Sequence, residues 1–250
     1  MRITNKNGVV ISDIYSWEKA FKEVDGEPSH WRVGRSAWAL ANHFTSPDIV
    51  FSNGIKDLTL NLSKQGLTDV VMTHAEIEHE SRFDKYRGKG RMQDLVIWAR
   101  NNDIPIAICI EAKVDECFNN SIPDAYESAK IVLEKNPRSK AKQRIEDLCS
   151  KYYVGKKIEE LSHIRYQLLY YLAGSITEAV KIKGIVYMPV IVYHTSEYDK
   201  NAGKNNKTDY ITFMESLRFN RIETSDETLM YKNNIDGVEI YSSYIEVYST

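Results

Sequence analysis

A carboxylate and an ammonium close a stretch of the chain that is otherwise apolar. In "PIAICIEAKVDE", residues 105–116, five apolar residues precede Glu111, and Lys113 follows with only Ala112 between them. Side chains at positions i and i+2 of a strand point to the same face, so Glu111 and Lys113 should project together. The pair is either a solvated ion pair at a strand end or part of a reactive site, and the buried character of the strand favours the second interpretation.

A second carboxylate lies on the preceding predicted strand. In "RMQDLVIWAR" (91–100) apolar residues alternate, which puts Asp94 on the same side as Val96. "NNDIP" is a turn signal, so this strand and the next form a predicted hairpin. We expect Asp94, Glu111 and Lys113 to converge on one face of a sheet, with the two carboxylates within about 6 Å of each other.

Two carboxylates held this close together repel each other, and burial increases the repulsion. A divalent cation removes the conflict, because Mg²⁺ (or Mn²⁺) takes hard oxygen ligands, commonly one or two carboxylates with water and a substrate phosphate. A lysine beside that ion can stabilise developing negative charge or help to activate a water molecule. The three residues therefore predict metal-dependent phosphodiester hydrolysis.

Asp94 followed by Glu111-x-Lys113 on the next strand resembles the signature of the PD-(D/E)xK nuclease superfamily. The segment "YQLLYY" places Gln167 and Tyr171 four residues apart, which resembles the Gln-x-x-x-Tyr element of several branches of that superfamily. The resemblance implies a restriction endonuclease-like fold and a nuclease activity.

The resemblance covers about residues 74–195, and "HAEIEHESRFDKYRGKG" before the Asp94 strand resembles uncharacterised bacterial members. It departs from the superfamily pattern at Gln93, where the name of the superfamily has a proline.

The resemblance also implies roles for individual residues. It assigns catalysis to Asp94, Glu111, Lys113 and Gln167, and metal binding to Asp94 and Glu111. The Ala112 carbonyl is a further candidate ligand. An acidic residue of the preceding strand often joins such a site, and here the candidates are Glu76, Glu78 and Glu80, of which Glu78 is favoured.

A basic, glycine-containing loop precedes the Asp94 strand. "DKYRGKGR" (84–91) carries four cationic residues, Lys85, Arg87, Lys89 and Arg91. Either the loop is simply solvated or it binds DNA, since a basic segment beside Asp94 is well placed to contact phosphates.

The remaining pattern predicts an α/β protein with a mixed sheet flanked by helices. Helical spacing predicts helices at 16–24, 34–44, part of 54–64, 120–160 with a break at 136–139, 163–180 and about 209–219. Strands are predicted at 74–81, 91–100, 105–114, 184–194 and 237–249, with Pro189 indicating a bulge or an edge strand. We expect one domain over 1–250, with a core at about 74–195 and a helical N-terminal part at 1–65.

Composition limits the function classes. The 250 residues carry 33 Lys and Arg against 35 Asp and Glu, a formal charge of −2, which excludes a histone-like polycation. Three cysteines without a CxxC spacing, no signal peptide and no apolar run of 18 residues predict a cytoplasmic protein that does not enter a membrane.

Together these patterns predict a Mg²⁺-dependent endodeoxyribonuclease that acts in restriction or phage defence. DNA is the expected partner, RNA is not excluded by the sequence, and a homodimer is compatible with it. One alternative is a non-catalytic nucleic-acid-binding or scaffold protein with the same fold. Another is an enzyme that uses the same carboxylates on a phosphorylated small molecule.

Overall fold

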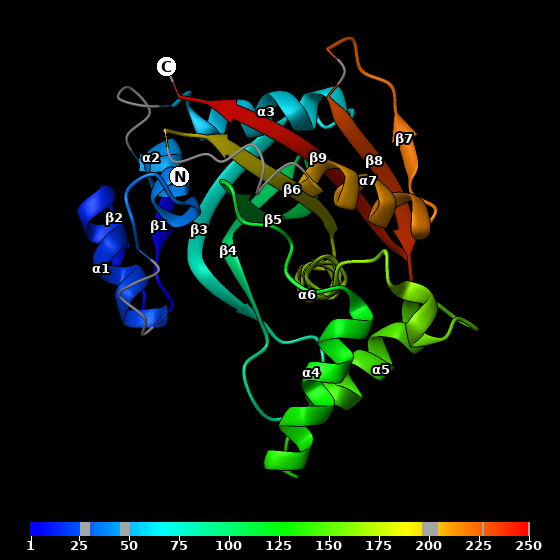
Figure 1. The fold of residues 1–250 in the computed structure, drawn as a ribbon. Coiled ribbons are helices and arrows are strands. Elements are labelled where there is room, and N and C mark those ends of the chain that lie inside the picture. The colour runs from blue at the N-terminus through cyan, green and yellow to red at the C-terminus, as the bar shows by residue number, and fades with distance from the viewer. Residues whose placement is uncertain (26–30, 46–50, 197–204, 227, 250) are drawn as a thin grey trace.

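One nine-stranded mixed sheet carries the fold in this computed structural model, which describes residues 1–25, 31–45, 51–196, 205–226 and 228–249 (Figure 1). The strand order is β2-β1-β3-β4-β5-β6-β9-β8-β7. The strands are β1 (Arg2–Thr4), β2 (Val10–Ile11), β3 (Val70–Ser81), β4 (Arg91–Asn101), β5 (Ile104–Lys113), β6 (Ile185–His194), β7 (Asn220–Ile222), β8 (Leu229–Ile235) and β9 (Val238–Tyr248). The predicted α/β class with a mixed sheet is confirmed.

The centre of the sheet changes from antiparallel to parallel at β5. β3, β4 and β5 form an antiparallel meander, and β5 then pairs in parallel with β6, which pairs in parallel with β9. The predicted hairpin is confirmed, because Leu95 faces Ile110 at one end and Asn101 faces Ile104 at the turn. A parallel pair needs a crossover connection, and the chain between β5 and β6 supplies it as helices.

Helices cover both faces of this sheet (Figure 1). They are α1 (Ile14–Asp25), α2 (Ser36–Thr45), α3 (Gly54–Lys64), α4 (Ile122–Lys135), α5 (Ala141–Tyr152), the 3₁₀ helix η2 (Ile158–Leu161), α6 (Tyr166–Ile182) and α7 (Asn206–Ser216). Alternating residues of β5 show the two layers: Cys109 packs into the core with α4, α5, α6 and α7, whereas Ile108 packs into the core with α1, α2 and α3. Within the described residues, no helix has the length and apolar character required to cross a bilayer.

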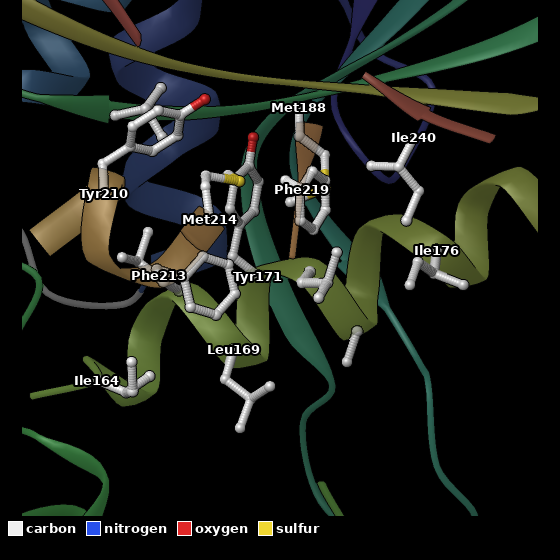
Figure 2. Close-up of a cluster of buried hydrophobic side chains, with 14 of the residues drawn as sticks. Ile164, Leu169, Tyr171, Ile176, Met188, Tyr210, Phe213, Met214, Phe219 and Ile240 are labelled. Carbon is white, nitrogen blue, oxygen red and sulfur yellow. The ribbon is translucent and has the colours of Figure 1, made fainter. Parts of the chain in front are cut away.

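Helix α6 lies directly against the centre of the sheet, and Figure 2 shows its side chains meeting residues of α7 and β6. A close approach is possible because Gly174 has no side chain. A Cβ atom there would lie 2.8 Å from Nε2 of Gln93 and 3.0 Å from the Arg91 side chain, both on β4. The sequence therefore needs a glycine at the point where α6 crosses β4.

Pro189 lies in the middle of the sheet, so its predicted position on an edge strand is wrong. β6 has a neighbour on each side, β5 and β9. Pro189 has no N–H to donate, and the β5–β6 pairing is interrupted there, between the pairs Ile108–Tyr187 and Glu111–Val190. A hydroxyl from α6 fills the interruption: Oη of Tyr171 donates to the Cys109 carbonyl at 2.5 Å and lies 3.1 Å from the Pro189 carbonyl.

The Tyr171 hydroxyl should therefore contribute to stability. In Tyr171→Phe the Cys109 carbonyl loses its donor in a fully buried place, which typically costs about 1–3 kcal/mol of unfolding free energy. Urea denaturation measures this difference. Tyr170→Phe is the matched control, because the hydroxyl of this half-buried neighbour makes no hydrogen bond within the described residues. Equal stability of the two variants would contradict the structural role.

Candidate active site

The candidate site lies where β4 and β5 separate. Their pairing ends at Leu95 and Ile110, while β5 continues beside β6 as far as Lys113. The Asp94 side chain occupies this opening, and its Oδ2 accepts a hydrogen bond of 2.7 Å from the backbone N–H of Ala112. A side chain thus takes the place of the next main-chain bond of the ladder, and the carboxylate is fixed beside Glu111.

Asp94 does not share the side of Val96, as the simple alternation predicted. Val96 packs in the core with α6, and Gln93 also faces α6, where its Nε2 lies 3.5 Å from Oγ of Ser175. Asp94 instead borders a cavity of about 390 Å³ on the side of α1 and α2, together with Trp17. The expectation that Asp94 projects from the same face as Glu111 and Lys113 is therefore wrong.

An irregularity in the neighbouring strand accompanies this change of side. On β3, Ile77 faces Leu95 and His79 faces Gln93, so Glu78 falls opposite Asp94. Glu78 has φ of +48°, a left-handed conformation that is unusual inside a strand. Regular alternation cannot continue through such a position, which explains why the period-2 pattern failed at Asp94.

Glu111, Lys113 and Gln167 meet on the α6 side of the opening, as predicted. Oε1 of Glu111 accepts a hydrogen bond of 2.6 Å from Nε2 of Gln167 and lies 3.0 Å from the Lys113 ammonium. The same ammonium donates to Oε1 of Gln167 at 3.4 Å. Gln167 thus bridges the carboxylate and the ammonium and fixes their relative positions.

Arg91 completes this group, although the sequence interpretation assigned it to the DNA-binding loop. It lies in β4, its side chain is 12% exposed, and its guanidinium pairs with Oε2 of Glu111. The other three cations of the predicted DNA-binding set, Lys85, Arg87 and Lys89, are exposed in the loop between β3 and β4. Arg91 therefore belongs to the charged group around Glu111 and not to the exposed basic loop.

The two carboxylates respond oppositely to this environment. Burial and the neighbouring Glu111 carboxylate raise the pKa of Asp94 to about 7. Burial alone would also raise the pKa of Glu111, but Arg91 and Lys113 outweigh it and lower that pKa. Arg91 and Lys113 therefore keep Glu111 ionised, whereas the repulsion between the two carboxylates makes ionisation of Asp94 less favourable.

The three glutamates of β3 have different surroundings. Glu76 accepts a hydrogen bond of 2.8 Å from Nδ1 of His79, and Glu80 accepts one of 2.7 Å from the backbone N–H of Gly90. Glu78 borders the same cavity as Asp94. Of the three candidates, Glu78 is thus the one that shares a cavity with the Asp94 carboxylate.

The residues fit a hard divalent cation in one arrangement. The Asp94 side chain borders the cavity, and its Oδ1 accepts no hydrogen bond within the described residues. The Ala112 carbonyl points to the same side of its strand as the Ala112 N–H, which is the side of Asp94. Mg²⁺ commonly takes one or two carboxylates and completes its shell with water, which these groups allow.

Among the described residues, few protein groups other than Asp94 and the Ala112 carbonyl are available as ligands for such a cation. In the part of the chain that the structure describes, no group of three or more His, Cys, Asp and Glu side chains is arranged to hold a metal ion. Both oxygens of Glu111 are engaged by Arg91, Lys113 and Gln167, so Glu111 can serve as a ligand only if it shares an oxygen with them. The arrangement suits a partly hydrated ion and not one enclosed by protein ligands.

A buried carboxylate–histidine–carboxylate group lies next to the site and was not predicted. His79 lies 2.8 Å from Glu76 and 3.3 Å from Glu178 of α6, and Glu178 also pairs with Lys181 at 2.7 Å. Burial alone would lower the pKa of His79, but Glu178 and Glu76 outweigh it and raise the pKa to about 9. No sequence spacing could have joined residues of β3 and α6.

This group predicts a pH-dependent stability. Because the folded-state pKa of His79 is raised, its stabilisation is complete below pH 6.5 and is lost as the pH rises through about 9. We expect the unfolding free energy of the wild type to fall by about 2–3 kcal/mol more than that of His79→Gln between pH 6 and pH 9.5. Urea denaturation at several pH values measures the difference, with exposed His163→Gln as the control. Parallel curves for the wild type and His79→Gln would contradict it.

Comparison with known proteins gives a family but no activity. Residues 10–248 match the family described as Domain of unknown function (DUF6946). The chain belongs to this family. No curated protein and no solved structure matches the chain. The DUF6946 match covers both helical layers and every strand of the sheet except β1, so it includes the whole candidate site.

Proposed function

We propose that this DUF6946 protein is a Mg²⁺-dependent endonuclease of the PD-(D/E)xK type that cleaves DNA. The observation that carries the proposal is the opening between β4 and β5. Glu111, Lys113 and Gln167 are bonded to one another on its α6 side, and Asp94, bonded to the Ala112 N–H, borders the cavity on the side of α1 and α2. Two strand-borne carboxylates that can hold Mg²⁺ and a lysine beside them are parts that metal-dependent hydrolysis uses. The glutamine on the following helix resembles the Gln-x-x-x-Tyr element of the superfamily. A restriction endonuclease-like fold is part of the proposal.

Each residue has a distinct role in this proposal. Asp94 holds the ion through Oδ1, with Glu111 and the Ala112 carbonyl as further ligands, and Mg²⁺ (or Mn²⁺) supplies Lewis-acid chemistry and a more acidic water molecule. Lys113 presents its ammonium to the phosphate and stabilises the charge that develops there. Gln167 orients Lys113 and Glu111 through one hydrogen bond to each.

The exposed basic loop is the proposed phosphate contact. Substituting Lys85, Arg87 and Lys89 together by alanine should weaken DNA binding regardless of sequence and reduce the salt slope of log K by about 0.9 for each lost phosphate contact. Fluorescence anisotropy in EDTA at several salt concentrations measures both effects. The control replaces three exposed cations of the α4–α5 region, Lys135, Arg138 and Lys140. If the two triple variants have equal effects, the basic loop is a solvated loop without a specific role in DNA binding.

Nicking of supercoiled plasmid DNA, with and without Mg²⁺, tests the proposed activity. Nicked and linear products that require Mg²⁺ are expected. DNA binding without cleavage would favour the non-catalytic DNA-binding alternative. If the protein neither binds nor cleaves DNA, the proposal is overturned, and chemistry on a phosphorylated small molecule is favoured instead.

A further inference from the structure

A cleft of about 470 Å³ adjoins the candidate site on the α6 side of the sheet. We call it the tyrosine cleft, and it is defined by Arg91, Arg144, Tyr166, Gln167 and Tyr170. Helices α4 and α5 form its other wall, where Ala129 and Ile145 line it. Arg91 and Gln167, which line the cleft, both contact Glu111, so the cleft borders the proposed catalytic group.

Two aromatic rings give the tyrosine cleft its character. Tyr166 and Tyr170 lie one turn apart on α6, with ring centroids 5.5 Å apart and an interplanar angle of 31°. Phe83 packs edge-on against Tyr170 from behind, at 5.0 Å and 90°, and limits the movement of that ring. A flat ligand can stack on such a surface, and nucleobases of every kind do so.

The charges of the cleft favour a base over a phosphate as its occupant. Both guanidinium groups are already neutralised, Arg91 by Glu111 and Arg144 by Asp84. A phosphate would thus find little net positive charge there.

The size and position of the cleft limit the form of the nucleic acid. Its volume is within the range of small-ligand pockets, so it suits one nucleotide and not a double helix. In a duplex the bases are stacked inside, and a base enters a protein pocket only from a single strand or after it flips out. Because Gln167 joins the cleft to Lys113, the phosphate of such a nucleotide lies beside the proposed catalytic group.

We infer that the tyrosine cleft takes the base of one unpaired nucleotide next to the phosphate that is cleaved, so that single-stranded DNA is the preferred substrate. This inference rests on the proposed nuclease function. It goes further because it names the strand form and the residues that select it, Tyr166 and Tyr170.

Fluorescence anisotropy in EDTA, where cleavage is stopped, tests the inference with three labelled probes. They are a single-stranded 12-mer, its duplex, and a 12-unit strand of abasic sugar phosphates that keeps the charge but has no bases. The wild type should bind the single strand at least tenfold more tightly than either of the other two. Tyr166→Ala and Tyr170→Ala should each weaken single-strand binding about tenfold and leave abasic-strand binding unchanged.

Three variants act as controls. Tyr166→Phe keeps the ring and should keep the affinity, and Tyr15→Ala removes an exposed ring on the other side of the sheet without effect. Ser128→Leu narrows the cleft from its exposed rim on α4 with a side chain that cannot stack on a base, and it should reduce the preference for bases even if the tyrosine variants fold poorly.

The outcomes separate this inference from the proposed function. Equal binding of intact and abasic strands, or an unchanged preference in Ser128→Leu, would overturn the inference, even in a protein that nicks plasmid DNA. Absence of both DNA binding and plasmid nicking would overturn the proposed function, and the inference with it.

Discussion

Lys113→Ala is expected to slow Mg²⁺-dependent DNA cleavage by about 10²–10³-fold while the protein still folds and binds the metal. The ammonium is preorganised by Glu111 and Gln167 beside the proposed phosphate position, and removing such a charge typically lowers the rate by this factor. Folding should persist because Glu111 keeps Arg91 and Gln167 as partners. Single-turnover cleavage of plasmid DNA measures the rate.

Lys181→Ala is the matched control for this prediction. Lys181 also pairs with a buried glutamate of the same region, Glu178, at 2.7 Å, but it lies outside the candidate site. The control removes the same kind of ion pair and should leave the cleavage rate unchanged. A rate in Lys113→Ala that equals the rate of this control would mean that Lys113 is a structural ion-pair residue.

Arg91→Met is expected to lower the free energy of unfolding by about 3 kcal/mol, the largest stability effect we predict. The substitution removes the closest cationic partner of a buried carboxylate, and breaking a buried pair in this way typically costs about 3–5 kcal/mol. Lys113 and Gln167 remain beside Glu111, so the lower end of that range applies. Arg87→Met in the exposed loop should change the stability by less than about 0.5 kcal/mol.

A double-mutant cycle separates the pair from the size of the side chain. Glu111→Gln removes the charge that Arg91 neutralises and keeps the shape of the side chain. If the pair is the cause, Arg91→Met combined with Glu111→Gln should be more stable than the sum of the two single effects predicts. Additive effects in urea denaturation would show that Arg91 acts through packing alone.

Local patterns predicted the parts of the site that depend on a single element. Glu111 and Lys113 project together because alternation along β5 is regular, and Gln167 reaches them from the helix that the sequence placed after the strands. The hairpin of β4 and β5 followed from its turn signal. Short elements were missed, because strands of two or three residues such as β1 and β2 have too few positions to establish a period.

The failures occur where distant elements interact. Asp94 changes side beside the left-handed Glu78 on a different strand, and nothing in the Asp94 segment itself indicates this. Arg91 belongs to a run of basic residues but pairs with Glu111, a partner 20 residues later. Pro189 was predicted at a bulge or an edge because the rule for missing N–H groups does not anticipate that Tyr171 would fill the interruption in a central strand.

Binding of Mn²⁺, followed by electron paramagnetic resonance without DNA, tests most directly whether Asp94 anchors a catalytic metal ion. The proposal predicts that the wild type and Lys113→Ala bind the ion and that Asp94→Asn does not. The asparagine keeps an oxygen for the Ala112 N–H, so the variant should fold. Glu116→Gln is the control, because Glu116 lines the same cavity and its carboxylate is already bonded to Ser36 and Val114. Equal Mn²⁺ affinity in the wild type and Asp94→Asn would contradict the proposal.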